Sequence, residues 1–320
     1  MTSSRDTILR TGAALAVTAL ALTGCSAGQP GPAAATVPRT VPAGPAADPS
    51  AWTLPMEAYR PTAEQTRTLA RAEQKLVDRC LKGFGIDWKP APELPEIGPK
   101  NLLDWRYGIH DTAMSAKFGY QVDPAQQARY DQALREADAR PRPSDDVELV
   151  LGGTDVPAEI REKASPEVRG GVYAGRRIPE GGCFGEARRT LGGSSQGVSP
   201  LVQRLTYDSY PASARDPRVR EVFARWSACM KAEGYTYPAP MAANDDPRFR
   251  PRPGGPSRLE IDTALADLGC RATYRVAEVW HDAETRIQRA AITREASALA
   301  ADRRALDTTL RTAAGVLARP

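Results

Sequence analysis

Histidine is scarce in this 320-residue sequence, because it occurs only twice, as His110 and His281. The five cysteines include no C-x2-C pair, so the usual residue pattern of a structural zinc site is missing. No glycine-rich phosphate-binding motif occurs either. We therefore expect no metal site and no cofactor.

Charge of one sign is not in large excess. The 43 Lys and Arg residues face 39 Asp and Glu residues, which gives a net charge of +4, and acidic residues are interspersed with basic ones throughout. Nucleic-acid-binding proteins usually gather Lys and Arg in a patch or stripe. We therefore expect no nucleic-acid partner.

The N-terminal apolar run, residues 11–23, is too short to anchor the chain by itself, since a membrane-spanning helix needs about 20 apolar residues. Arg5 and Arg10 precede the run, and it ends in the lipobox Leu22-Thr23-Gly24-Cys25. This stretch resembles bacterial lipoprotein signal peptides. The resemblance implies removal of residues 1–24, a fatty-acylated diacylglyceryl group on Cys25, and attachment to the extracytoplasmic face of the cell membrane. The alternative is an ordinary secretory signal with an incidental cysteine.

Residues 25–51 are rich in Pro, Ala and Gly and show no apolar periodicity, which predicts a lipid-anchored tether. The roughly 25 residues from Ser26 to about Ser50 would span about 75 Å if they were fully polyproline-like, at about 3.1 Å each. Residues 52–320 then form the folded body. The chain is 41% hydrophobic and 26% charged, as is ordinary for a globular protein.

The N-terminal residues of several helices can be recognised in the body. Thr62 and Gln65 have the spacing of a capping box before an apolar stripe that includes Cys80, and Gly83 and Gly85 should end this helix. Further start signals are Asp111, Asp123-Pro124, Asp216-Pro217 and Ser257. Between Pro95 and Pro211 the pattern is broken: 145–151 is ambiguous between helix and strand, and 170–182 suggests a small hairpin.

The interval 271–314 contains neither glycine nor proline, so we predict one long helix, unbroken from near Cys270 to about Ala314, within a C-terminal helical region that starts near residue 257. Its apolar residues have alternating four- and three-residue steps and then near-heptad spacing: Val276, Trp280, Ala283, Ile287, Ile292, Leu299, Leu306 and Leu310. We predict that this stripe packs against the helix that starts at Thr62. Alternatively, its distal half forms a coiled-coil contact with an envelope protein or a second copy.

Two parts of the sequence resemble each other. Residues 80–92 (CLKGFGIDWKPAP) match residues 229–240 (CMKAEGYTYPAP), and each is followed by a Gly-Cys pair that opens another helical stretch, at 182–183 and 269–270. We call these the first and the second repeat copy. Of the three pairings that four cysteines allow, the symmetry of the repeat favours Cys80 with Cys183 and Cys229 with Cys270. Disulfides are permitted in an exported chain.

The sequence also resembles a group of uncharacterised secreted lipoproteins of actinobacteria. The resemblance rests on the lipobox, on residues 226–231 (WSACMK) with Gly234-Tyr235, on Gly181-Gly182-Cys183, and on residues 264–270 (ALADLGC) before a long helix. It implies a mainly helical, disulfide-stapled body. It implies no catalytic residue.

Two motifs in the sequence have residue types that catalysis uses. Residues 193–197 (GSSQG) match G-x-S-x-G, but the buried strand that must precede a nucleophile elbow is missing, so a turn is the better interpretation of Ser195. His110 beside Asp111 has the composition of a general base, although a surface histidine is the simpler interpretation. We predict no catalytic residue and a binding or structural role at the cell envelope, with an envelope hydrolase that uses Ser195 or His110 as the alternative.

Overall fold

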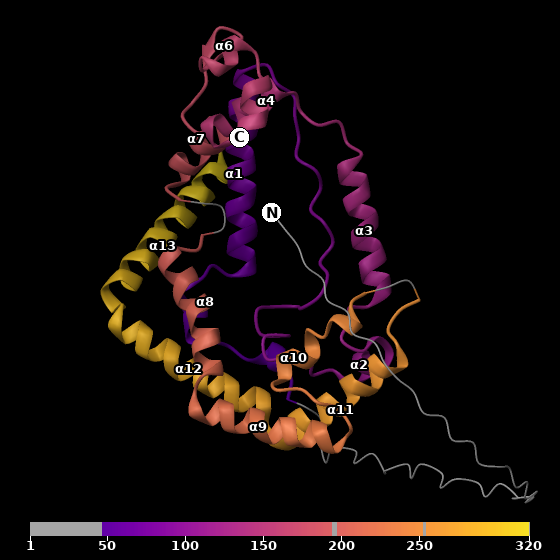
Figure 1. Cartoon of the computed structure of the whole chain (residues 1–320). Helices are drawn as coiled ribbons and strands as arrows, with labels where there is room; N and C mark the ends of the chain where they lie inside the picture. The colour runs from indigo at the N-terminus through magenta and orange to yellow at the C-terminus, as the bar shows by residue number, and fades with distance from the viewer. Residues whose placement is uncertain (1–46, 194–196, 252–253, 320) are drawn as a thin grey trace, which may run out of the picture. The chain divides into compact units, whose positions relative to one another are not determined.

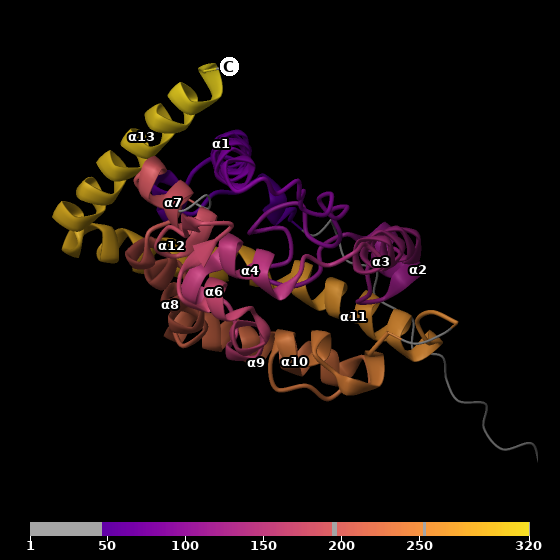
Figure 2. The ribbon, with the colours of Figure 1, turned by 90° about the horizontal axis from the view of Figure 1, so that it is seen from above.

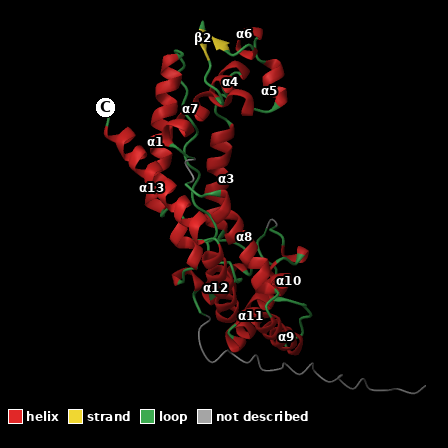
Figure 3. Ribbon diagram, turned by 90° about the vertical axis from the view of Figure 1, so that its left-hand side faces the viewer, coloured by secondary structure: helices red, strands yellow, loops and turns green. Residues whose placement is uncertain are grey.

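The computed structural model describes residues 47–193, 197–251 and 254–319. Contacts divide the chain into residues 1–39 and residues 40–320, and every described residue belongs to the second unit. The signal peptide, Cys25 and most of the predicted tether lie outside the described residues. Helices make up almost all the regular structure that is described (Figure 3), so the fold is mainly α, as predicted. None of the described helices is both long and apolar enough to cross a bilayer.

The elements follow one another in two stretches (Figure 1). Before residue 194 the chain forms two 3-10 helices, η1 (Pro49–Ala51) and η2 (Pro55–Tyr59), then α1 (Ala63–Gly83), α2 (Thr112–Phe118), α3 (Pro124–Asp138), α4 (Asp145–Gly152), η3 (Gly153–Asp155), α5 (Ala158–Lys163), α6 (Pro166–Arg169), the hairpin β1 (Val172–Tyr173) and β2 (Arg176–Arg177), and α7 (Gly182–Leu191). After residue 196 it forms α8 (Pro200–Ala214), α9 (Pro217–Ala232), α10 (Pro240–Asn244), η4 (Pro247–Phe249), α11 (Arg258–Tyr274), α12 (Val276–Arg294) and α13 (Ala296–Ala318).

Most helix starts are those that the sequence predicts. The Thr62 hydroxyl accepts from the Gln65 amide while the Gln65 side chain accepts from the Thr62 amide, which completes the capping box of α1. The predicted caps Asp111, Asp123, Asp216 and Ser257 each accept from a first-turn amide of α2, α3, α9 and α11. The ambiguous segment 145–151 is helical in α4, with Ser144 as its cap. The suggested hairpin is the antiparallel pair β1–β2.

The first repeat copy is buried around the Cys80–Cys183 disulfide. This bond joins α1 to the start of α7, and the two cysteines are 103 residues apart in sequence. Val77 and Leu81 on α1 pack there with α4 residues and with Trp88 from the following loop. The other face of α1 lies against α13 (Figures 1 and 2), so α1 is held from both sides.

The second repeat copy is buried in the same way around the Cys229–Cys270 disulfide. This bond joins α9 to α11 across 41 residues of sequence. Trp226 and Met230 occupy the positions that Val77 and Leu81 hold in the first copy, and Tyr237 takes the place of Trp88. Both disulfides are the pairs expected from the repeat.

The backbone after each of these helices also repeats. In the first copy the Gly85 amide donates to the Lys82 carbonyl and the Ile86 amide to the Leu81 carbonyl. The second copy has the same two bonds, shifted by 149 positions, and its glycine, Gly234, has a positive φ like that of Gly85. This is the helix end that a glycine at C′ allows. The copies differ at the second cysteine. Gly182-Cys183 opens α7, whereas Gly269-Cys270 lies inside α11, so the prediction that it opens a helix was wrong.

The C-terminal region is long and helical, but the prediction of an unbroken helix from Cys270 to Ala314 was wrong. The chain bends at Arg275, which has a left-handed φ of 53°, and again at Glu295. A left-handed residue with a side chain costs about 1–2 kcal/mol. Packing offsets this cost, because the bend lets α11 and α12 both lie against α9.

The apolar stripe of this region is covered by the chain itself. Val276, Trp280 and Ala283 are buried against α9 and the loop before α2. Leu299 packs with Met56 and Val202, and Leu306 packs against α1. The predicted packing against the helix that starts at Thr62 is therefore found for the α13 part of the stripe, whereas the α12 part packs against α9 instead.

Candidate functional site

A pocket of about 220 Å³ lies between the segment 98–111, which we call the 98–111 loop, and the helix α2 that follows it. Its lining is mixed. Trp105, Ile109 and Met114 contribute apolar surface, whereas polar and charged side chains come from Lys100, Asp104, His110, Asp111, Ser115, Gln121, Asp123 and Gln126. We call it the His110 pocket. A hollow of about 420 Å³ near Cys80 is larger, but arginine side chains dominate its polar lining and it contains no histidine.

His110 is held by a buried carboxylate. Its Nε2 lies 2.6 Å from Oδ1 of Asp104, whose side chain is 5% exposed. Oδ2 of Asp104 accepts from the Lys100 amide, which fixes the carboxylate within the loop. An ionised Asp104 is only an acceptor, so this contact places a proton on Nε2. Nδ1 faces Asp48, at 3.6 Å from Oδ1.

Asp111, the neighbour that the sequence suggests for His110, has a different role. Its carboxylate accepts from the amides of Ala113 and Met114 and so caps α2. The partner of the imidazole is instead Asp104, six residues earlier, because the turns of the 98–111 loop bring the two side chains together.

The 98–111 loop is fixed to α12 by a buried polar network around Glu284, whose side chain is fully buried. Arg106 donates to both carboxylate oxygens, at 2.5 and 2.9 Å, and the Tyr107 hydroxyl donates at 2.8 Å. From α8, Ser209 donates to the same carboxylate at 2.7 Å. Arg106 and Tyr107 belong to the 98–111 loop, so this network sets the position of the loop.

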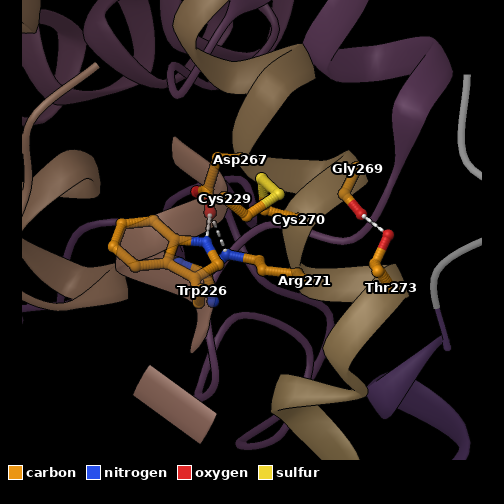
Figure 4. The surroundings of a disulfide bond; sticks show 7 residues. All are labelled: Trp226, Cys229, Asp267, Gly269, Cys270, Arg271 and Thr273. Atoms are coloured by element: carbon orange, nitrogen blue, oxygen red, sulfur yellow. Dashed lines mark hydrogen bonds and ion pairs between the residues drawn. A yellow bond between two sulfur atoms is a disulfide. The ribbon is translucent and has the colours of Figure 1, made fainter. Parts of the chain in front are cut away.

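A second buried network fixes the same loop to α11. Asp267 accepts from Trp226 Nε1 at 2.8 Å and from Arg271 Nε at 2.6 Å, next to the Cys229–Cys270 disulfide (Figure 4). The Tyr120 hydroxyl also donates to it, at 3.1 Å. Arg271 also donates through Nη1 to the carbonyl of Tyr107. Tyr107 therefore touches both networks, one through its backbone and one through its hydroxyl.

Gly108 is required at the point where Arg271 meets the loop. Its φ is +101°, and a Cβ built on it would lie 2.3 Å from Nη1 of Arg271. Any larger residue would displace the guanidinium or the loop. This glycine, two residues before His110, thus belongs to the support of the site.

Burial also changes the proton affinities of the two tyrosines in these networks. It raises the pKa of Tyr107, and the Glu284 carboxylate beside the phenol raises that pKa further. The pKa of Tyr120 is raised by burial and by Asp267. Both phenols therefore stay protonated at neutral pH and act as hydrogen-bond donors.

The outer side of the pocket is apolar and partly exposed. Trp105 on the 98–111 loop is 38% exposed and Met114 on α2 is 36% exposed. Large aromatic and thioether side chains in such positions are typical of surfaces that contact a ligand. The pocket thus combines an apolar rim with a charged interior.

The hydrolase alternative finds little support in the described residues. Ser195 lies outside them, and so does Cys25. Among the described residues neither imidazole bonds a serine, threonine or cysteine side chain: His110 meets two carboxylates, and His281 Nε2 meets the carbonyl of Thr53. The four remaining cysteines form the two disulfides.

Comparison with models of protein families, with curated proteins and with solved structures found no match. The sequence does not mark Asp48 or Glu284 as parts of a site, because their partners His110 and Arg106 lie 62 and 178 residues away. Asp104 and Asp267 have partners nearby in sequence, but only the structure shows that these pairs are buried.

Proposed function

We propose that this protein is a lipoprotein anchored through Cys25 at the extracytoplasmic face of the cell membrane, where it binds a ligand in the His110 pocket. The lipobox and the Pro- and Ala-rich segment support the anchoring. The two disulfides support an oxidising compartment, since such bonds are rare in proteins of the cytosol. The likeness to secreted actinobacterial lipoproteins points the same way.

The observation that carries the binding role is the rigid support of the pocket. The 98–111 loop carries Trp105 and His110, and two buried ion pairs hold it, Arg106 with Glu284 and Arg271 with Asp267. A loop that is already ordered loses less conformational entropy when a ligand binds. A mixed apolar and polar pocket on such a support is the usual form of a ligand site.

The binding role can be tested by photocrosslinking in intact cells. A photoreactive phenylalanine analogue replaces Met114 at the rim of the pocket and, as a matched control, Tyr207, which is 76% exposed on α8. We expect a discrete adduct from position 114 that position 207 does not form. Equal labelling from both positions, or none from position 114, would contradict the proposal.

The anchoring can be tested separately by mass spectrometry of the membrane fraction. We expect the N-terminal peptide to begin at a diacylglyceryl-modified Cys25 and to be lost from the membrane fraction in Cys25→Ser. An unmodified Cys25 in the membrane-bound chain would refute the anchoring but leave the pocket untouched.

An envelope hydrolase remains the second candidate, because Asp104 orients His110 much as an acid orients a catalytic base. A broad fluorophosphonate probe distinguishes the two. Labelling of the purified protein that disappears in Ser195→Ala and in His110→Ala would favour the enzyme, whereas the binding role predicts no labelling.

A further inference from the structure

The 98–111 loop and the end of the predicted tether meet at His110. Residues 47–51, assigned to the tether by the sequence, are already part of the folded body: they include η1, and the Ser50 carbonyl accepts from the Asn101 side chain. Asp48 caps η1 by accepting from the Ser50 amide. The same carboxylate faces Nδ1 of His110, so two segments far apart in sequence place an imidazole and a carboxylate side by side.

The distance between these two groups is informative. Nδ1 of His110 and Oδ1 of Asp48 are 3.6 Å apart, which is too long for a good hydrogen bond. Two ligands of one tetrahedral zinc ion, each about 2.0–2.2 Å from the metal, lie roughly 3.3–3.6 Å apart. The spacing thus fits two ligands of a common ion as well as a direct ion pair.

The other side of the ring is arranged as it is in metal sites. A metal-binding histidine usually donates its second ring N–H to a carboxylate, which fixes the tautomer and makes the coordinating nitrogen more basic. Asp104 does this for His110, because it accepts from Nε2 at 2.6 Å and is itself fixed by the Lys100 amide. A carboxylate oxygen of Asp48, a carboxylate oxygen of Asp104 and a ring nitrogen of His110 lie within 4.8 Å of one another.

The surroundings allow a cation. Two positive charges lie in these surroundings. Arg271, which lines a small cavity together with His110, is paired with Asp267 at 2.6 Å. The Lys100 ammonium acts on Asp48 from a distance and is a minor influence on that carboxylate. His110 and the neighbours of Asp48, Ala47 and Pro49, also line a cavity of about 10 Å³. By this measure the cavity is about large enough for one water molecule, which could fill a coordination position.

We propose that His110, through Nδ1, and Asp48 bind a divalent transition-metal ion, with Zn²⁺ as the best match, and that Asp104 is the residue that positions the imidazole. Water or a ligand group completes the coordination. The ion ties the last residues of the tether to the 98–111 loop, and it lies next to the His110 pocket. This site goes beyond the proposed binding role and does not depend on the identity of the ligand bound there.

The test is titration of the purified full-length chain, isolated without a histidine tag, with Zn²⁺ by calorimetry and with Co²⁺ by visible absorption. We expect one ion per chain and a Co²⁺ spectrum of a low-coordinate site. His110→Ala should abolish binding, and Asp48→Asn should weaken it at least 10-fold. Asp104→Asn should weaken it about 10- to 100-fold, the range found when the partner of a metal-bound histidine is removed.

His281→Gln is the matched control, because it removes the other imidazole, which also lies near a carboxylate, at 4.0 Å from Asp282. Its affinity should equal that of the wild type. Asp48 is 57% exposed, so Asp48→Asn should fold normally, as circular dichroism can verify. Absence of binding at millimolar Zn²⁺, or unchanged affinity in both Asp48→Asn and His110→Ala, would overturn the proposal.

Discussion

Glu284→Gln should be among the most destabilising single substitutions on α12, because it removes the one negative charge of a buried network. The variant leaves Arg106 with a buried guanidinium and no counter-charge. It also turns one acceptor oxygen into a donor. Arg106 and Tyr107 both donate to Oε2, and Arg106 and Ser209 both donate to Oε1, so an amide nitrogen at either place meets two donors.

The expected loss follows from the burial of this pair. Breaking a buried ion pair by removing one partner costs about 3–5 kcal/mol, and unsatisfied donors add to this. Exposed pairs contribute only about 0–1 kcal/mol. Glu278→Gln, on the same helix, is therefore a matched control, since its partner Arg275 is 74% exposed.

The assay is urea unfolding at neutral pH with the disulfides intact, followed by far-ultraviolet circular dichroism. Glu284→Gln should lower the free energy of unfolding by about 3–5 kcal/mol, and Glu278→Gln by less than about 1 kcal/mol. The double variant Arg106→Met with Glu284→Leu should recover much of the loss, because neither charge is then left alone. The reasoning would be refuted if the two single variants lost similar stability.

Three further predictions concern the rest of the fold. Replacing Cys80 and Cys183 by alanine opens a loop of 103 residues and should lower the free energy of unfolding by about 4.7 kcal/mol. Replacing Cys229 and Cys270 opens a loop of 41 residues and should lower it by about 3.9 kcal/mol. Thermal unfolding of the two double variants tests this order. In the same assay, Gly182→Ala should destabilise the fold far more than Gly171→Ala. Both glycines have positive φ, but a Cβ at 182 would lie 2.5 Å from the carbonyl oxygen of Leu151 in α4, whereas a Cβ at 171 would meet nothing within 4 Å. The pKa of Tyr107 is higher in the folded chain than in the unfolded chain, so its phenol ionises at lower pH when the chain is unfolded. The free energy of unfolding should therefore fall as pH rises above about 10, and it should fall less steeply in Tyr107→Phe. An equal dependence on pH in the two proteins would contradict this.

The sequence by itself predicted the features that neighbouring residues determine. Thr62 with Gln65 and Asp123 with Pro124 start their helices because a side chain satisfies amides two or three positions away. The two glycines at 85 and 234 end theirs because the helix end needs a positive φ. The disulfide pairs could be predicted because the two helix ends match in sequence, so each cysteine at a helix end was expected to pair with the second cysteine of its own repeat copy.

Only the tertiary structure decided where the C-terminal helices bend and which groups surround His110. Arg275 takes a left-handed conformation that nothing in its neighbourhood of the sequence signals, because packing on both sides of the bend offsets the local cost. Asp48 reaches His110, and Arg106 reaches Glu284, across 62 and 178 residues of sequence. Hydrogen bonds and ion pairs act over a few ångströms in space, so contacts between such distant residues exist only once the helices have packed.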